Sequence, residues 1–362
     1  MQKRVGIITI FDLTNYGNRL QNYAVQKILT DQGFEAKTFH TNVFSFGFGW
    51  KYRTKKLIHV LTGYHLSKNR ADWDQRNKND LFERFTKRYL PTEKVESIDG
   101  LAENADFFVI GSDQVWNPVW YRSNIQDLYL LTFAKPEQKV CLSPSFGISG
   151  LPDDWKPFFR ENLKTFPSLN VREKVGAEII KELTGRDAQV TIDPTLMLDA
   201  EEWLKVAKKP HGVATRKPFL LTYFLGERTE KTQKDIDEIM KLRDLKVYHL
   251  LDLSQPRVYA CGPSEFVYLF SKADIVLTDS FHACVFSFLF NKPFVVYDRV
   301  QKGWRSMNSR LESLLSMLQL ERKYRDKNLG IDWFECDYTD GWTVLKEERK
   351  KLKEYLIREL NP

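Results

Sequence analysis

Short runs of apolar residues alternate with stretches of helical periodicity along nearly the whole chain. Residues 5–10 predict a first strand, and the apolar residues within 20–29 recur at helical spacing until Gly33 ends the helix. Further strands are predicted at 36–40, 107–110, 140–143, 169–172 and 190–192, with helices at 76–88, 155–165 and 176–184. This alternation is typical of a parallel sheet that is covered by helices on both faces.

A second series of the same kind follows residue 200. It predicts strands at 219–224, 246–251, 274–278 and 293–297, with helices at 229–242, 264–272 and 282–291. We therefore expect two α/β domains, 1–200 and 201–362, with a cleft between them. A basic insertion at about 43–75 interrupts the first domain, and a charged amphipathic helix at about 344–360 ends the second.

The composition of the 362-residue chain is that of an ordinary globular protein, with 42% hydrophobic and 28% charged residues. No apolar run approaches the roughly 20 residues that span a bilayer, and the chain starts directly with a strand pattern, so we expect no signal peptide. The four cysteines show neither a CxxC nor a zinc-ligand spacing. Reduced thiols and a cytoplasmic location are the expectation.

The net charge of +7 is unevenly distributed, because residues 51–70 hold six Lys or Arg and no Asp or Glu. Apolar and aromatic residues accompany these charges, a combination that suits the inner face of a membrane or a lipid-linked substrate. A solvated helix that packs by one face is an equally good interpretation. No nucleic-acid-binding motif accompanies the segment, so no nucleic-acid partner is expected.

Polar residues follow the first strand at the start of the first helix. Asn15, Asn18 and Gln21 offer amide groups there, and Gly17 permits a close approach of the backbone to a ligand. A single glycine is not a dinucleotide-binding fingerprint. The segment is therefore either a ligand loop or a polar turn with a helix cap.

The strand at 107–110 is likewise followed by polar side chains. Trp116 could stack on a sugar ring while Asp113 or Asn117 hydrogen-bonds its hydroxyl groups. The alternative is a capped turn with a buried tryptophan. Arg172, at the end of a later strand, could bind a phosphate or carboxylate, or could pair with Glu173. Asp193 precedes a proline and is interpreted as a structural turn residue.

Residues 278–298 contain the strongest candidate for chemistry. His282 lies between a predicted strand and a predicted helix, beside Asp279 and Ser280, where it could exchange protons near neutral pH. Alternatively, Asp279 or Ser280 caps the helix and His282 is a satisfied, partly buried group. Lys302, Arg305 and Arg310 form a cationic group just before the next helix, where an anion could bind.

Seven segments resemble, in this order, the polysaccharide pyruvyl transferase family. They read NYGNRLQNYA, GSDQVWNP, SFG at 145–147, VREK, DPT, GPSEFVYLFSKADIVLTDSFHA and NSRLESLL. The resemblance implies two Rossmann-like domains that face a central cleft, as in GT-B glycosyltransferases. It also implies transfer of pyruvate from phosphoenolpyruvate onto a sugar of a bacterial surface polysaccharide or its lipid-linked precursor, with a cyclic ketal and phosphate as products.

The resemblance also suggests roles for the candidates. His282 would be the general acid/base, and the anionic donor would contact Arg172, Ser280, Arg305 and Arg310. The acceptor would contact Asn15, Asn18, Gln21, Asp113, Trp116 and Asn117. No metal is implied, and no cofactor beyond phosphoenolpyruvate as co-substrate.

One position departs from the family. Family members often have Arg-Leu-His where this chain has Ser280-Phe281-His282. Either Arg305 or Arg310 supplies that charge from the next loop, or the donor differs in this branch. Two alternatives remain open: a GT-B glycosyltransferase that uses a nucleotide sugar, and a non-catalytic sugar-binding protein.

Overall fold

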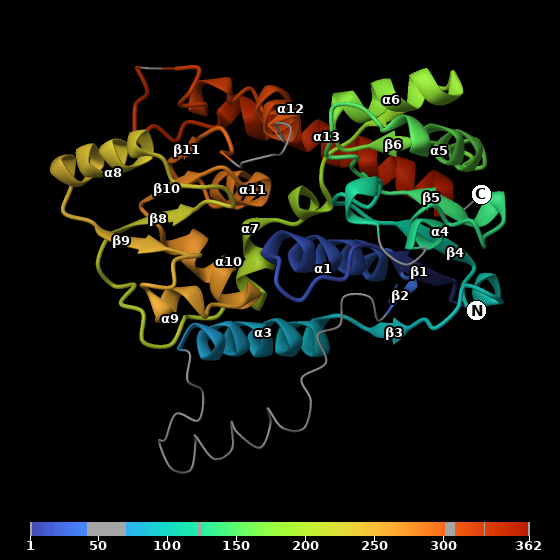
Figure 1. Ribbon diagram of the computed structural model, residues 1–362, viewed down its shortest axis with the longest axis horizontal. Coiled ribbons are helices and arrows are strands. Elements are labelled where there is room, and N and C mark those ends of the chain that lie inside the picture. The colour runs from blue at the N-terminus through green and yellow to red at the C-terminus, as the bar shows by residue number, and fades with distance from the viewer. Residues whose placement is uncertain (1, 42–69, 122–124, 301–307, 329, 361–362) are drawn as a thin grey trace, which may run out of the picture.

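The computed structural model describes residues 2–41, 70–121, 125–300, 308–328 and 330–360 (Figure 1). The first sheet has five parallel strands in the order β3-β2-β1-β4-β5. Its strands are β1 (Arg4–Ile8), β2 (Glu35–His40), β3 (Thr92–Lys94), β4 (Phe107–Ile110) and β5 (Lys139–Cys141). The second sheet has four parallel strands in the order β11-β10-β8-β9. Its strands are β8 (Phe219–Tyr223), β9 (Lys246–His249), β10 (Ile275–Thr278) and β11 (Phe294–Val296).

A third, two-stranded parallel sheet pairs β6 (Asn170–Val171) with β7 (Gln189–Val190). The helices follow in chain order: α1 (Tyr16–Asp31), α3 (Arg70–Tyr89), α4 (Ile125–Tyr129), α5 (Lys156–Leu163), α6 (Lys174–Thr184), α7 (Ala200–Val206), α8 (Glu230–Leu242), α9 (Pro256–Tyr259), α10 (Pro263–Lys272), α11 (Phe281–Leu289), α12 (Ser309–Met317) and α13 (Thr339–Leu360). Parallel strands with intervening helices confirm the predicted α/β class with two Rossmann-like units.

The predicted strands all occur, within a few residues at their ends. Two details differ. Strand β3 was not predicted, because its three residues, Thr-Glu-Lys, lie at a sheet edge and carry no apolar signal. The strands predicted at 169–172 and 190–192 pair with each other and not with the first sheet.

One hydrophobic core is shared by the two larger sheets. Val5 and Ile7 of β1 belong to the same buried cluster as Leu221 of β8 and Val276 of β10. Helices α1, α7, α10 and α11 fill the space between the sheets (Figure 1). The outer faces have cores of their own, because successive strand residues point to opposite sides: Ile8 joins a second cluster and Ile275 a third.

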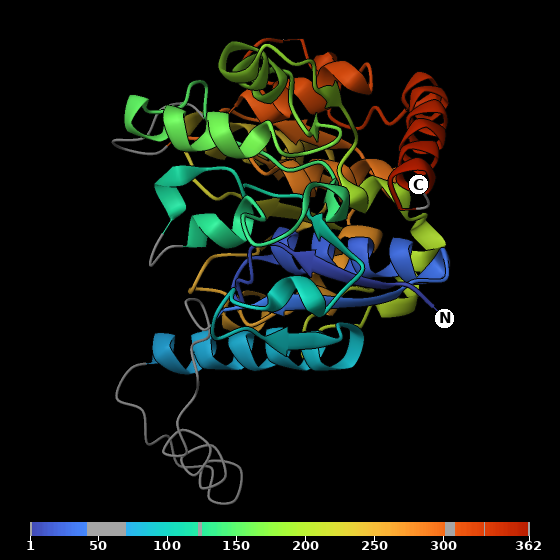
Figure 2. The same cartoon turned by 90° about the vertical axis from the view of Figure 1, so that its right-hand side faces the viewer.

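Helix α13 extends from the second sheet back to the first, and the two chain ends lie near each other (Figures 1 and 2). Arg349 of α13 donates to the carbonyl oxygens of Leu196 and Leu198. Near its end, the Leu360 carbonyl accepts a hydrogen bond from Lys3 at 3.2 Å. The predicted domain boundary near residue 200 remains a prediction.

Both large sheets change direction beside their first strand. From β1 the chain adds β2 and β3 on one side, then β4 and β5 on the other, so the change lies between β1 and β4. In the second sheet it lies between β8 and β10. In open α/β sheets, ligands bind at the carboxyl ends of strands beside such a point.

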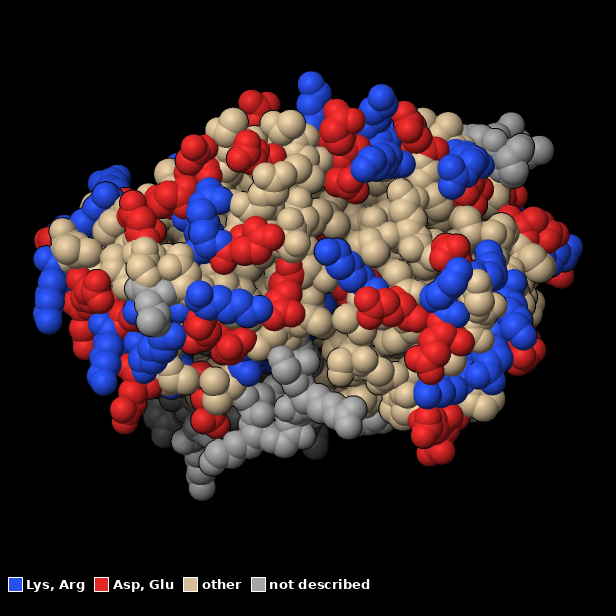
Figure 3. Space-filling view, turned by 90° about the horizontal axis from the view of Figure 1, so that it is seen from above, with Lys and Arg blue, Asp and Glu red and all other residues tan. Residues whose placement is uncertain are grey.

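No helix in the described ranges is long and apolar enough to cross a membrane. The predicted membrane-contact segment, 51–70, falls outside the described residues except for Arg70. On the face shown in Figure 3, basic and acidic side chains are interspersed and form no single basic field.

Candidate functional site

The loop after β1 is fixed by its own amide and carboxylate groups. Asn15 caps α1, since its side chain accepts a hydrogen bond from the Asn18 backbone. Asn18 is buried, and its Oδ1 accepts from the backbone of Asp12 and from the Arg19 guanidinium. Gln21 donates to Thr9 just beyond β1 at 2.6 Å. The predicted ligand loop is therefore also a well-capped helix start.

The loop after β4 turns sharply at Asp113, which has a φ of 77°. A positive φ is strained for a residue other than glycine, and such strain is often found at functional sites. The Asp113 carboxylate accepts from its neighbour Gln114 and, at 3.5 Å, from the Asn18 side chain. The loops after β1 and β4 thus meet where the first sheet changes direction.

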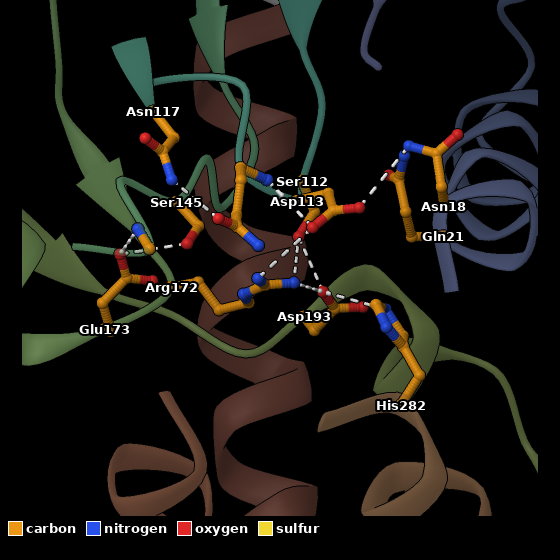
Figure 4. A network of polar contacts seen from close by, with 12 residues as sticks. Asn18, Gln21, Ser112, Asp113, Asn117, Ser145, Arg172, Glu173, Asp193 and His282 are labelled. Atoms are coloured by element: carbon orange, nitrogen blue, oxygen red, sulfur yellow. Dashed lines mark hydrogen bonds and ion pairs between the residues drawn. The ribbon is translucent and has the colours of Figure 1, made fainter. Parts of the chain in front are cut away.

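Two residues that follow the strands of the small sheet form a buried ion pair beside the loop after β4. Arg172 follows β6 and Asp193 follows β7, and their Nη1 and Oδ2 atoms lie 2.7 Å apart (Figure 4). Ser112 also donates to Asp193 Oδ2, at 2.6 Å. The second Arg172 nitrogen, Nη2, lies 3.7 Å from Asp113 Oδ1. Two carboxylates therefore bracket one arginine.

Helix α11 brings His282 to this pair from the second sheet. The His282 Nε2 atom lies 3.8 Å from Asp193 Oδ2, too far for a hydrogen bond but close enough for electrostatic coupling (Figure 4). Phe281 beside it stacks under the Arg172 guanidinium, 4.4 Å from its ring centroid. On its other side the imidazole touches Gly17, where an added Cβ would lie 2.0 Å from Nδ1. The carboxyl ends of the two sheets therefore face each other, as predicted.

The charges of this cluster follow from burial and proximity. Burial lowers the pKa of His282 and outweighs the opposing effect of Asp193 and Asp113, so the imidazole is neutral at pH 7. For Asp193, burial alone would raise the pKa, but His282 and Arg172 hold it well below its usual range. At pH 7 a neutral imidazole thus lies beside an ionised carboxylate.

Arg172 and Arg310 act electrostatically on His282, and Arg299 in turn acts on Arg310. Burial and the charges of Arg172 and Arg299 lower the pKa of Arg310, at the start of α12, to about 10. Arg299, which follows β11, lies 3.6 Å from Asp279. Like charges placed so close favour binding of an anion. Arg305 lies outside the described residues.

Asp279 and Ser280 flank the approach to the histidine. The Asp279 carboxylate accepts from the backbones of Leu225 and Gly226, both at 2.7 Å, so it fastens the loop after β8. Ser280 precedes α11 as its N-cap residue, is buried, and makes no capping hydrogen bond with its side chain. Ser280 thus lies at a helix N-terminus next to His282, where an anion would be favoured.

A cavity of about 260 Å³ opens beside the cluster at the first sheet. It is lined by Ile10, Asp12, Asn15, Asn18, Asp113, Gln114, Trp120 and Tyr129. Carboxylates, amides and one partly exposed indole are the groups that bind sugar hydroxyls and ring faces. Its volume is slightly below the about 300–1,000 Å³ of typical ligand pockets, which suits one sugar unit.

The predicted role of Trp116 is wrong. Its ring is fully buried against Phe146 and Phe166, and its Nε1 donates to the Tyr129 carbonyl, so neither face is open to a sugar. Trp120, four residues later, lines the cavity instead and is 37% exposed.

Gln21 and Asn117 are also buried. Gln21 joins α1 to Thr9, while Asn117 caps the short 3₁₀ turn at Pro118–Trp120. The structure therefore does not support a direct contact of either with the acceptor. The residues of the site that were not predicted include Asp12, Ser112, Trp120, Asp193 and Arg299. The sequence did contain a signal for Asp193, because it follows a predicted strand just as Asp113 does.

A second cavity, of about 500 Å³, lies at the carboxyl ends of β8 and β9. Thr222 and His249 are on its wall, with Oγ1 and Nδ1 2.6 Å apart. Arg228 and Asp252, an ion pair at 2.8 Å, also line it.

The model of the polysaccharide pyruvyl transferase family matches residues 15–299. The match includes every strand of the two large sheets except β1, and it includes the Arg172, Asp193 and His282 cluster. No curated protein matches the chain in sequence.

Among solved structures, the chain is similar to a glycosyltransferase from Rickettsia africae, with 12% identity, a TM-score of 0.47 and full coverage of both chains. It is also similar to the UDP-GlcNAc 2-epimerase from Neisseria meningitidis bound to UDP-GlcNAc, with 12% identity and a TM-score of 0.43 over 99% of this chain and 100% of that one. These scores indicate only a distant likeness.

Proposed function

Because the chain belongs to the polysaccharide pyruvyl transferase family, we propose that it transfers pyruvate from phosphoenolpyruvate onto a sugar of a surface polysaccharide or of its lipid-linked precursor. The products are a cyclic pyruvate ketal and inorganic phosphate. The observation that carries the proposal is the position of His282, 3.8 Å from Asp193 and under the electrostatic influence of Arg172 and Arg310, beside a cavity lined by sugar-binding groups.

The donor would bind where positive charge gathers. Phosphoenolpyruvate carries a phosphate and a carboxylate, and both are good partners for guanidinium groups. Arg172, Arg299 and Arg310 supply these, and the N-terminus of α11 at Ser280 adds its positive partial charge. In this proposal Arg299 and Arg310 provide the cation that the family often has at position 280. Arg305 remains a prediction.

His282 would move the protons. In its neutral form it accepts the proton of a sugar hydroxyl as that oxygen attacks C2, and it delivers a proton to the methylene carbon, which becomes a methyl group. Asp193 stabilises the imidazolium that forms in between. A second hydroxyl of the same sugar then attacks C2, the bond from C2 to the phosphate oxygen breaks, and the phosphate leaves with the second proton. No cofactor besides the co-substrate enters this scheme.

The acceptor would occupy the 260 Å³ cavity. Asp12, Asp113 and Asn18 present acceptors and donors for hydroxyl groups, and Trp120 presents a ring face. Asp113 contacts both the cavity and Arg172, so a sugar held there would lie next to the donor.

The decisive experiment measures phosphate release from phosphoenolpyruvate, with and without nucleotide-linked and lipid-linked sugars. We expect acceptor-dependent release by the wild type and a loss of about 10²- to 10⁴-fold in His282→Gln, the range for a general acid/base. His40→Gln is the control, because His40 is a half-buried histidine stacked on Phe11. Equal rates in His282→Gln and the wild type would remove His282 from the chemistry.

Glycosyl transfer from a nucleotide sugar is a second candidate, favoured by the 500 Å³ cavity at the second sheet. Under this alternative, a nucleoside diphosphate would raise the melting temperature of the protein, and Arg228→Ala would remove the effect. Stabilisation by phosphoenolpyruvate but not by the nucleotide would decide for pyruvyl transfer. Binding of sugar without turnover, unchanged in His282→Gln, would instead indicate a non-catalytic sugar-binding protein.

A further inference from the structure

Lys78 is a buried cation enclosed by aromatic rings. It lies on α3, only 4% of its surface is exposed, and its Nζ atom is 4.7 Å from the ring centroid of Tyr16 and 5.2 Å from that of Tyr259. Phe82 is the third ring, at 6.0 Å. In the described ranges, no carboxylate forms an ion pair with Lys78, and no acceptor takes a hydrogen bond from it.

An unpaired buried ammonium group is costly for a folded protein. Desolvation of an ion is costly, and the aromatic faces around it return only part of that cost. Burial lowers the pKa of Lys78 to about 8, so the charged form still predominates at pH 7. The Nζ atom itself keeps some contact with solvent. A bound anion would supply the missing counter-charge.

The position of Lys78 connects it with the acceptor cavity. Its closest ring belongs to Tyr16, the residue after Asn15, and Asn15 and Asp12 both line that cavity. Among the described residues, Asp12 is also one of two titratable groups that act on Lys78. The other is Cys261, whose carbonyl accepts a hydrogen bond from the Tyr16 hydroxyl. Lys78 therefore lies where the two α/β units meet, within electrostatic reach of Asp12 on the cavity wall.

Lys78 is separate from the arginines of the proposed donor site. The charged groups that act on His282 are Asp193, Asp113, Arg172 and Arg310. None of these acts on Lys78. The site thus has two cationic regions, one around His282 and one at Lys78, within electrostatic reach of Asp12.

We propose that Lys78 binds the phosphate or diphosphate group through which the acceptor sugar is attached to its carrier, while the sugar occupies the 260 Å³ cavity. This inference rests on the proposed function and adds to it that the acceptor is a phosphate ester. A lysine suits this task, since an ammonium group interacts with phosphate as a point charge and needs no fixed geometry. The shared chemistry is the diphosphate, whether a nucleoside or a lipid carries it.

The first test measures the affinity for inorganic pyrophosphate by calorimetry, with the donor site saturated by phosphoenolpyruvate. We expect binding by the wild type and a loss of about tenfold or more in Lys78→Met, because a charge-assisted contact is removed. Lys139→Met is the matched control. Lys139 is also only 4% exposed and lies over a ring, that of Phe166, but it donates a hydrogen bond to Thr165. Its replacement should leave pyrophosphate binding unchanged.

One further variant, a melting measurement and two further ligands sharpen the test. Lys78→Arg should restore most of the binding, and ligand-free Lys78→Met should melt at or above the wild-type temperature, because an unpaired buried charge is gone. Uridine diphosphate and farnesyl diphosphate then distinguish a nucleoside carrier from a lipid carrier. For the ligand with the natural carrier, Lys78→Met should lose more affinity than it loses for pyrophosphate. For the other ligand it should not.

Equal pyrophosphate binding by the wild type and Lys78→Met would overturn the inference. So would a lower melting temperature of Lys78→Met together with unchanged pyrophosphate binding, since that result would make Lys78 a packing residue. Failure of phosphoenolpyruvate to bind the wild type would overturn the proposed function. A repeat of the pyrophosphate titrations without phosphoenolpyruvate keeps the two outcomes distinct.

Discussion

Gly17, at the start of α1, lies against the imidazole of the candidate catalytic histidine, His282. An alanine Cβ there would lie 2.0 Å from His282 Nδ1, well inside van der Waals contact, so either the imidazole or the start of α1 must move. We expect Gly17→Ala to reduce phosphate release by about 10²-fold, the effect of a displacement of about 1 Å. We also expect a loss of about 1–3 kcal/mol in the free energy of unfolding.

Gly150→Ala is the control for Gly17→Ala, because no atom lies within 4 Å of an added Cβ and the backbone has no positive φ. Comparison of steady-state rates with urea unfolding curves separates the two effects. Normal activity in Gly17→Ala would mean that the position of His282 next to α1 is not needed for the reaction.

His249 makes stability depend on pH. Burial, with help from Arg228, lowers its pKa from 6.5 to about 4. The unfolded chain therefore takes up a proton first as the pH falls, so the contribution of neutral His249 is fully present above about pH 6.5 and is lost towards pH 4. We expect the melting temperature to fall less between pH 7.5 and pH 5 in His249→Gln than in the wild type.

His249 is not the only histidine in the described residues that contributes to this pH dependence. His40 and His282 also have lowered pKa values, so the variant should retain part of the pH dependence. Identical pH profiles for both proteins would show that burial does not lower the pKa of His249.

At the residue scale, the sequence predicted positions better than orientations. His282, Arg172 and Asp113 follow strands, and the ends of parallel strands meet at one sheet edge, so their proximity could be expected. Trp116 also follows a strand, but only the tertiary structure decides that its ring enters the core and that Trp120 faces the cavity. Asp193 was interpreted as a turn residue. Its Oδ1 does accept a hydrogen bond from the Thr195 backbone, as expected of a turn residue, but its Oδ2 accepts one from Arg172.

At the scale of elements, strong apolar periodicity was sufficient to predict where a strand lies, and weak periodicity was not. The four central strands, β1, β4, β8 and β10, are apolar runs buried on both faces, and all were predicted within about two residues. Sheet membership was harder to predict. β6 and β7 are two residues long, and the local pattern cannot show that they pair with each other to place Arg172 against Asp193.

At the scale of the whole molecule, the two α/β units share one core, and this has a consequence for unfolding. Helix α13 follows the second sheet in sequence, yet Leu352, Leu356 and Leu360 are fully buried in the cluster that contains Val5 of the first strand. Units joined in this way should not unfold independently, because separation would expose the apolar faces of both. We therefore expect one transition, with coincident curves from circular dichroism and tryptophan fluorescence.

Leu352→Ala tests this cooperativity. It should lower the free energy of unfolding by about 2–5 kcal/mol, as for buried leucines in general, and should shift the entire transition without splitting it. Leu242→Ala is the control, because that leucine is 59% exposed at the end of α8 and should change stability by less than about 0.5 kcal/mol. If Leu352→Ala instead produced a second, earlier transition in one probe only, α13 would be a separable element, and the positions of Asp193 and His282 relative to each other would not depend on the shared core.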